Sequence, residues 1–86
     1  MAYLITIHVF REDTGQSMAG VPVSLSLSGY NDKTDSSGRV SFNVPDNSGD
    51  VYIFVNGTQI PKHGYPYDLR NVNVMVTPSG YFSRMV

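Results

Sequence analysis

Alternation of apolar and polar residues is the feature of this sequence that most restricts its fold. In residues 21–28 every odd position is apolar and every even position is a serine or a proline. Residues 3–11, 39–44 and 71–77 follow the same period of two. Successive side chains of a β-strand point to opposite faces, so this period predicts strands with one buried and one solvated face.

The composition agrees with this interpretation. Valine, isoleucine, threonine, tyrosine and phenylalanine occur 11, 4, 5, 6 and 4 times, whereas alanine, leucine, glutamate and lysine occur 2, 4, 1 and 2 times. The first group suits a pleated, half-buried surface, and the second group contains the good helix formers. We therefore predict an all-β fold.

Turn-forming residues divide the chain into short strands. We predict strands at residues 3–11, 21–28, 30–35, 39–44, 51–56, 71–77 and 81–86. Residues 51–56 are apolar on both faces, which predicts a central strand. Residues 60–68 contain two prolines and a glycine, and we predict an irregular segment there. Seven or eight strands at this spacing indicate a two-sheet, antiparallel or mixed Greek-key β-sandwich.

The inward positions of these strands form the predicted core. It consists of Ile5, Ile7, Val9, Val23, Leu25, Leu27, Val40, Phe42, Ile53, Val55, Val72 and Val74. Pro22 has no backbone N–H, so we place it at a strand start or an edge. Gly38 ends a tight turn, and we expect a positive φ there.

Length and charge exclude several classes of protein. The 86 residues allow one domain, residues 1–86, and the chain has no cysteine for a disulfide. The net charge of -1 argues against a nucleic-acid binder. No apolar run approaches the ~20 residues of a membrane span, and residues 1–10 lack the features of a signal peptide. We expect a cytoplasmic location if the chain is complete and an extracellular one if it belongs to a larger secreted protein.

Five short motifs carry a resemblance to a known family. They are Ile-Thr-Ile-His-Val-Phe at 5–10, Asp-Thr-Gly-Gln at 13–16, Ala-Gly-Val-Pro-Val at 19–23, Thr-Asp-Ser-Ser-Gly-Arg-Val at 34–40 and Thr-Pro-Ser-Gly-Tyr at 77–81. In this order they resemble the transthyretin-like family, which includes the hydroxyisourate hydrolases. The first half also resembles the carboxypeptidase regulatory-like domains. The resemblance implies a prealbumin-like sandwich.

The resemblance also implies three candidate catalytic positions. His8 and Arg39 match the first-strand histidine and the arginine of the hydrolases, whereas Asn71 stands where a second histidine is expected. The chain ends in Ser-Arg-Met-Val at 83–86 and lacks the terminal Tyr-Arg-Gly-Ser of those enzymes. An amide exchanges no protons near neutral pH, so we expect no hydroxyisourate hydrolase activity and lean towards a protein that is not an enzyme.

The candidate catalytic residues also have simpler interpretations. A histidine on a sheet face can act as a general base near pH 7, or it can form an ordinary surface or subunit contact. Arg39 can bind an anion through its planar guanidinium group, or it can be a solvated strand end. Asp32 and Asp35 are typical of turns, and the sequence holds no metal-ligand spacing, phosphate loop or cofactor motif.

Aromatic residues are the better candidates for ligand binding. Tyr65 and Tyr67 flank a proline, His63 precedes them, and Tyr30 and Tyr81 lie elsewhere in the chain. Tyrosine offers a large contact area at low entropic cost, so these residues can stack on a sugar, a small molecule or a protein partner. The alternative is that Tyr65 and Tyr67 close one end of the sandwich and that His63 is a surface loop residue.

Self-association is the last prediction. Leu4, Phe10 and Met75 are apolar at outward-facing positions, and residues 81–86 are mostly apolar. Transthyretin-like proteins assemble through this sheet face and the last strand, so the resemblance also implies a homo-oligomer. Three functions remain open: a non-catalytic binding or assembly module, a divergent hydroxyisourate hydrolase, and a structural domain of a larger surface or secreted protein.

Overall fold

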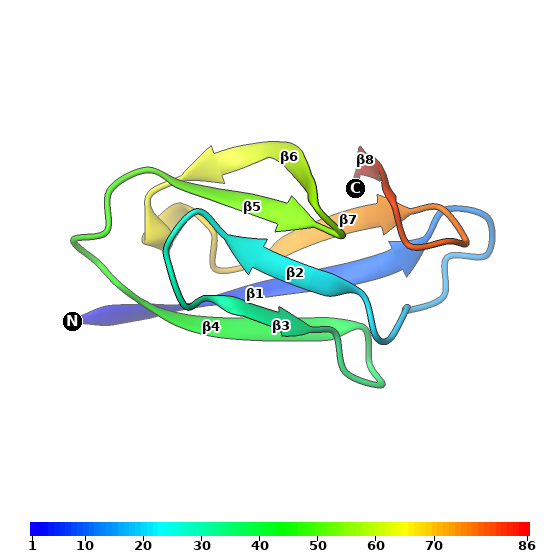
Figure 1. Ribbon diagram of the computed structural model, residues 1–86, viewed down its shortest axis with the longest axis horizontal. Coiled ribbons are helices and arrows are strands. Elements are labelled where there is room, and N and C mark those ends of the chain that lie inside the picture. Colours follow the sequence, from blue (N-terminus) through cyan, green and yellow to red (C-terminus); the bar gives the residue numbers. More distant parts are fainter.

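A computed structural model describes residues 1–86 as eight strands and one short 3₁₀ turn (Figure 1). The elements are β1 (Ala2–Arg11), β2 (Pro22–Leu25), β3 (Asn31–Lys33), β4 (Arg39–Pro45), β5 (Val51–Val55), β6 (Thr58–Gly64), η1 (Pro66–Asp68), β7 (Val72–Val76) and β8 (Phe82–Met85). The prediction of an all-β fold is confirmed. No helical segment is long and apolar enough to cross a membrane.

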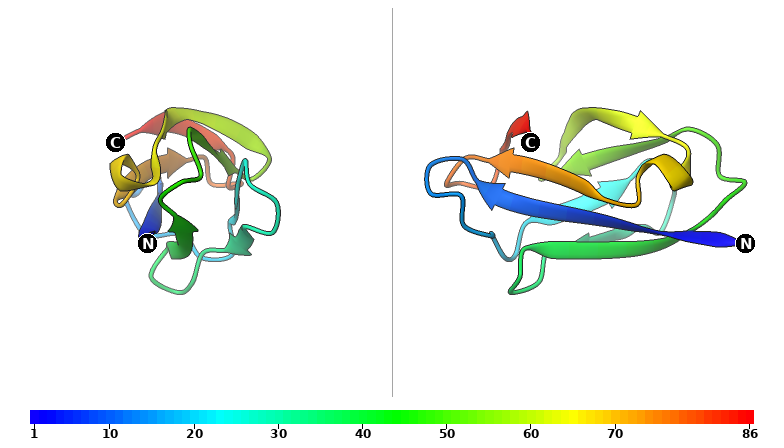
Figure 2. Two further views of the ribbon diagram at one scale, coloured as in Figure 1. Left: turned by 90° about the vertical axis from the view of Figure 1, so that its left-hand side faces the viewer. Right: turned by 180° about the vertical axis from the view of Figure 1, so that it is seen from behind.

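The strands form two sheets of four, which lie in two layers in Figures 1 and 2. One sheet has the order β4-β1-β7-β8 and the other has the order β3-β2-β5-β6. β1 pairs antiparallel with β4 and parallel with β7, whereas the remaining pairs are antiparallel. The predicted central position of residues 51–56 is confirmed, because β5 lies between β2 and β6.

The two sheets enclose one hydrophobic core of 17 buried side chains. Every predicted core residue belongs to it except Leu27, which is only partly buried against it. The prediction for Leu27 is wrong because β2 ends at Leu25, where the Leu25 N–H donates to the Tyr30 carbonyl and turns the chain. The predicted strand at 21–28 is shortened for the same reason.

The largest error of the sequence-based prediction concerns residues 60–68. Seven residues, Thr58–Gly64, form an edge strand, and the 3₁₀ turn Pro66–Asp68 follows. Pro61 is tolerated because it lies on an edge strand, where a ladder can lack a backbone donor. Ile60 is the one fully buried side chain of this strand and holds it to the core.

Two connections, residues 12–20 and 34–38, pack together beside the C-terminal part of β1. Gly38 has a φ of 74°, as predicted, and its carbonyl accepts the Val9 N–H at 2.8 Å. Val9 in turn accepts the Met18 N–H at 2.9 Å. The buried Thr34 hydroxyl donates to the Met18 carbonyl at 2.7 Å and accepts the Val21 N–H at 3.0 Å. These bonds fix residues 12–20 against the turn at 35–38.

Candidate functional site

A pair of tyrosines at one end of the sandwich forms the most distinctive exposed surface. Tyr65 and Tyr67 are half exposed, and their rings are nearly parallel, with centroids 5.9 Å apart and planes at 7°. Tyr3 meets Tyr67 edge-on at 6.2 Å. We call Tyr3, Tyr65 and Tyr67 the tyrosine platform.

The 3₁₀ turn explains why the rings of Tyr65 and Tyr67 face outward. Side chains three residues apart eclipse each other in a 3₁₀ turn, so Pro66 and Leu69 point in the same direction. Both are buried, and Leu69 is completely inaccessible to solvent. The Leu69 N–H donates to the Pro66 carbonyl at 3.1 Å, which closes the turn. Because Pro66 and Leu69 are buried, Tyr65 before Pro66 and Tyr67 between the two buried residues are left facing solvent.

Arg70 ties the platform to β1. Its Nε donates to the Tyr67 carbonyl at 3.1 Å. Its guanidinium carbon lies 5.9 Å from the centroid of the Tyr3 ring, within the range of a cation–π contact. The guanidinium group has no other hydrogen bond within the protein, so further N–H donors face solvent beside the rings.

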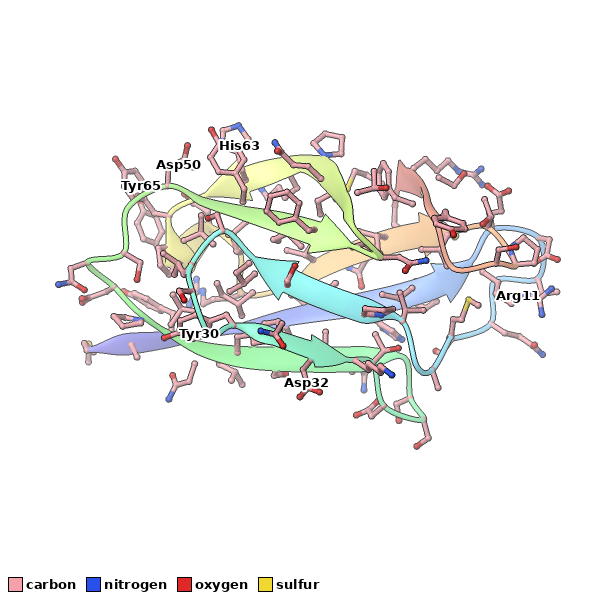
Figure 3. The ribbon with its side chains drawn as sticks, in the orientation of Figure 1. Arg11, Tyr30, Asp32, Asp50, His63 and Tyr65 are labelled. Carbon is pink, nitrogen blue, oxygen red and sulfur yellow. The ribbon has the colours of Figure 1, made fainter.

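A polar cluster at the start of β5 and the end of β6 lies in the same part of the molecule, where Figure 3 labels Asp50, His63 and Tyr65. His63 Nδ1 lies 3.0 Å from Asp50 Oδ1, and the His63 ring stacks on Tyr52 with centroids 4.6 Å apart. The hydrogen bond from His63 lowers the pKa of Asp50, and the Asp50 carboxylate raises the pKa of the Tyr52 hydroxyl. The cluster therefore holds the Asp50 carboxylate and the His63 imidazole in fixed positions. His63 is two residues before Tyr65 of the platform.

The other two predicted binding residues lie apart from the platform. Tyr30 packs edge-on against Phe42 at 6.2 Å and is partly buried against the core, so it acts as a structural residue. Tyr81 is 57% exposed but follows the turn after β7, at the opposite end of the long axis from η1 (Figure 1). The structure thus brings together Tyr65, Tyr67 and His63, and it leaves out Tyr30 and Tyr81.

The candidate catalytic residues occupy the outer face of the other sheet. His8 pairs in register with Arg39 of β4 and with Asn73 of β7. The residue beside His8 is therefore Asn73, whereas Asn71 directly precedes the first residue of β7. His8 Nε2 lies 3.0 Å from the Ser17 hydroxyl oxygen, a contact that the sequence did not predict.

Electrostatics favour the neutral form of His8. Burial lowers its pKa most, and the positive charge of Arg39 lowers it further, against opposing effects of a hydrogen bond to the Ser37 backbone and the Asp35 charge. Asp35 itself accepts the Ser37 and Arg39 N–H groups, which lowers its own pKa. Neither Arg39 nor Asn73 exchanges protons near neutral pH, so His8 has no acid–base partner among its strand neighbours.

We expect His8→Gln to flatten the pH dependence of stability. The lowered pKa of His8 in the folded state means that the unfolded chain binds a proton more readily. The stability contribution is therefore fully present above the unfolded pKa of about 6.5 and is lost as the pH falls through the lower folded value. Urea denaturation between about pH 7.5 and pH 5 measures this slope. Equal slopes in the wild type and the variant would contradict the assignment.

An open hollow of about 420 Å³ lies over β2 and β3 and does not include the platform. Its lining residues are Pro22, Val23, Ser24, Asn31, Asp32, Lys33 and Gly57. Only one of these is apolar, unlike the apolar lining of most small-molecule sites. A flat aromatic surface needs no cavity to bind a ligand, so we regard the platform as the stronger candidate. No group of three or more histidine, aspartate or glutamate side chains is placed to hold a metal ion.

Comparison with known proteins gives this chain no relatives. No protein-family model, no curated protein and no solved structure matches it. The resemblance to transthyretin-like proteins therefore stays a prediction, and the functional argument rests on the residues described above.

Proposed function

We propose that this protein is a non-catalytic binding module of the transthyretin-like or carboxypeptidase regulatory-like type, and that the tyrosine platform contacts a carbohydrate. The observation that carries the proposal is the pair of parallel, half-exposed rings of Tyr65 and Tyr67, held outward by the buried Pro66 and Leu69. Rings anchored in this way lose little entropy when a ligand binds.

The chemistry around the rings favours a sugar over an entirely apolar ligand. A pyranose presents a flat C–H face that stacks on an aromatic ring and a rim of hydroxyl groups. The platform supplies the ring faces, and Arg70, Asp50 and His63 supply donors and acceptors near its border. Tyrosine suits such a surface because it combines an apolar ring with a polar hydroxyl.

We also propose that the sandwich has Greek-key topology. The chain leaves β1, forms β2 and β3 in the opposite sheet, and returns as β4 to pair with β1. Adjacency of the first and fourth strands after such a detour is the characteristic of this connection.

Titration with a panel of neutral oligosaccharides, followed by amide chemical shifts, tests the proposed function. We expect shifts concentrated in residues 63–70. We expect Tyr65→Ala or Tyr67→Ala to weaken binding about tenfold or more, the effect of losing roughly 1.4 kcal/mol of ring contact.

Tyr81→Ala is the matched control for this titration. Tyr81 is as exposed as Tyr65 and Tyr67, but it follows the turn between β7 and β8, which lies at the other end of the molecule from η1, so its loss is expected to leave binding unchanged. The proposal fails if no saccharide of the panel binds at millimolar concentration, or if both platform variants bind as the wild type does.

A further inference from the structure

Three of the four sheet edges carry features that discourage pairing with another chain. β3 has only three residues, all exposed, and it contains Asp32 and Lys33. β6 contains Pro61 and Lys62. β8 has an irregular register and carries Arg84, whose guanidinium group lies 3.9 Å from Glu12. Short length, proline, lysine and bulges are the devices by which proteins protect an edge.

The middle of β4 has none of these protective features. It is seven residues long, pairs regularly with β1 and has no charged residue after Arg39. The only proline is Pro45, at the end of the strand. In the right-hand view of Figure 2, β4 forms the lower border of its sheet.

The hydrogen bonds show which backbone groups of β4 are unpaired. In an antiparallel pair, alternate residues bond to the neighbouring strand. The bonds from Val9 N–H to the Gly38 carbonyl and from Asp46 N–H to the Met1 carbonyl fix the phase. In that phase the even-numbered residues of β4 bond to β1, and the odd-numbered residues, Ser41 and Asn43 among them, point away from it.

At both ends of β4, the outward-facing backbone groups form hydrogen bonds within the same chain. Arg39 N–H donates to the Asp35 side chain, and the Arg39 carbonyl accepts the Asp35 N–H. The Pro45 carbonyl accepts the Ser48 N–H and hydroxyl. The N–H and C=O groups of Ser41 and Asn43 have no partner in the chain. We call these four groups the open window of β4.

We propose that a second copy of this chain pairs antiparallel with β4 through the open window. A two-fold axis at Phe42 places Ser41 opposite Asn43 of the other copy. Each of the two N–H groups then donates to a C=O group of the other copy, and each C=O group accepts from an N–H group of that copy. The open windows of two identical chains are therefore complementary. An isologous contact of this kind is the commonest form of protein dimer.

Side chains and charges support a second copy as the occupant. Phe42 lies opposite Phe42 of the other copy in the closely spaced, non-hydrogen-bonded position, and the exposed side chains of Ser41 and Asn43 stand opposite each other across the contact. The low net charge of -1 also gives weak repulsion between copies.

Sedimentation equilibrium at tens to hundreds of micromolar protein is the first test. We expect a monomer–dimer equilibrium, with slower exchange of the Ser41 and Asn43 amide hydrogens as the concentration rises, because exchange slows when an N–H becomes hydrogen-bonded. A monomer mass throughout this range would overturn the proposal, and so would a dimer in which these two amides exchange at an unchanged rate.

Variants at the window test the register. Asn43→Pro removes one donor and is expected to abolish the dimer while leaving the monomer folded, because this N–H bonds to nothing in the chain. Combining Ser41→Lys with Asn43→Lys places like charges opposite each other and is expected to weaken the dimer about tenfold or more. Combining Ser41→Lys with Asn43→Glu places opposite charges there and is expected to preserve the dimer.

The paired charge variants control for folding, because both carry the same number of substitutions at the same exposed positions. Circular dichroism of each variant confirms that the fold is retained. A dimer that survives Asn43→Pro but is lost on deletion of residues 81–86 would overturn the proposal in favour of assembly through β8. Saccharide binding by a monomeric Asn43→Pro variant leaves the proposed function intact, so the two proposals can fail separately.

Discussion

Phe42→Ala is expected to lower the free energy of unfolding by about 3–5 kcal/mol, the usual cost of truncating a buried phenylalanine. Phe42 is 7% exposed and lies in β4 opposite Ile5. Its ring also receives the edge of Tyr30 at 6.2 Å, so the substitution leaves a cavity between the sheets. A domain of this size has a small total stability, and we expect a large fraction of it to be lost. Chemical denaturation measures the change.

Phe82→Ala is the matched control, because Phe82 is only partly buried against the same core. Its loss is expected to cost about 1–2 kcal/mol, in proportion to the smaller apolar area removed from water. A loss below about 1 kcal/mol for Phe42→Ala, or equal losses for the two variants, would show that Phe42 does not fill the core.

Gly38→Ala is expected to cost about 2–5 kcal/mol, from backbone strain at a positive φ together with overpacking. An added Cβ would lie 2.8 Å from Ser17 Cβ and 2.8 Å from the Val9 carbonyl oxygen. The Val9 backbone cannot retreat without breaking its bond to Met18. We therefore expect the turn at 35–38 and the segment 12–20 to separate, with loss of the contact between His8 and Ser17.

Gly49→Ala separates the effect of backbone strain from the effect of overpacking. Gly49 has nearly the same φ, 77°, but nothing lies within 4 Å of the added carbon. Its substitution is expected to cost only the strain, about 1–2 kcal/mol. Thermal or urea denaturation of the two variants gives the contribution of the close approach by difference. Equal losses of stability in the two variants would mean that the turn at 35–38 and the segment 12–20 move apart at no cost.

The strand pattern was predictable where one face of a strand is regularly apolar. β1, β4 and β7 alternate along most of their length, and their predicted core residues are buried. β6 was missed because Ile60 is its one buried apolar residue, so the sequence carries no period of two. An edge strand that is held by one buried side chain and by backbone hydrogen bonds has no residue pattern from which it can be predicted.

The candidate site was predictable in part. Tyr65, Tyr67 and His63 stood out because they are close in sequence. Tyr3 and Arg70 were missed, since their contacts with the platform depend on the packing of η1 against β1. Asn73, which lies beside His8, was not among the candidates, because the register of a parallel pair is fixed by tertiary packing and nothing in residues 71–77 reports it.

The parallel pairing of β1 with β7 has a consequence for synthesis of the chain on the ribosome. Ile7 pairs with Val72, so β1 gains its second neighbour only after residues 72–76 have been made. The β3-β2-β5-β6 sheet draws only on residues 22–64 and can assemble earlier. Sheets with such distant pairings fold slowly, and an apolar strand that waits for a neighbour is prone to aggregate. The nascent protein is therefore most vulnerable between the emergence of β4 and that of β7, when chaperones that cover apolar strands have most to contribute.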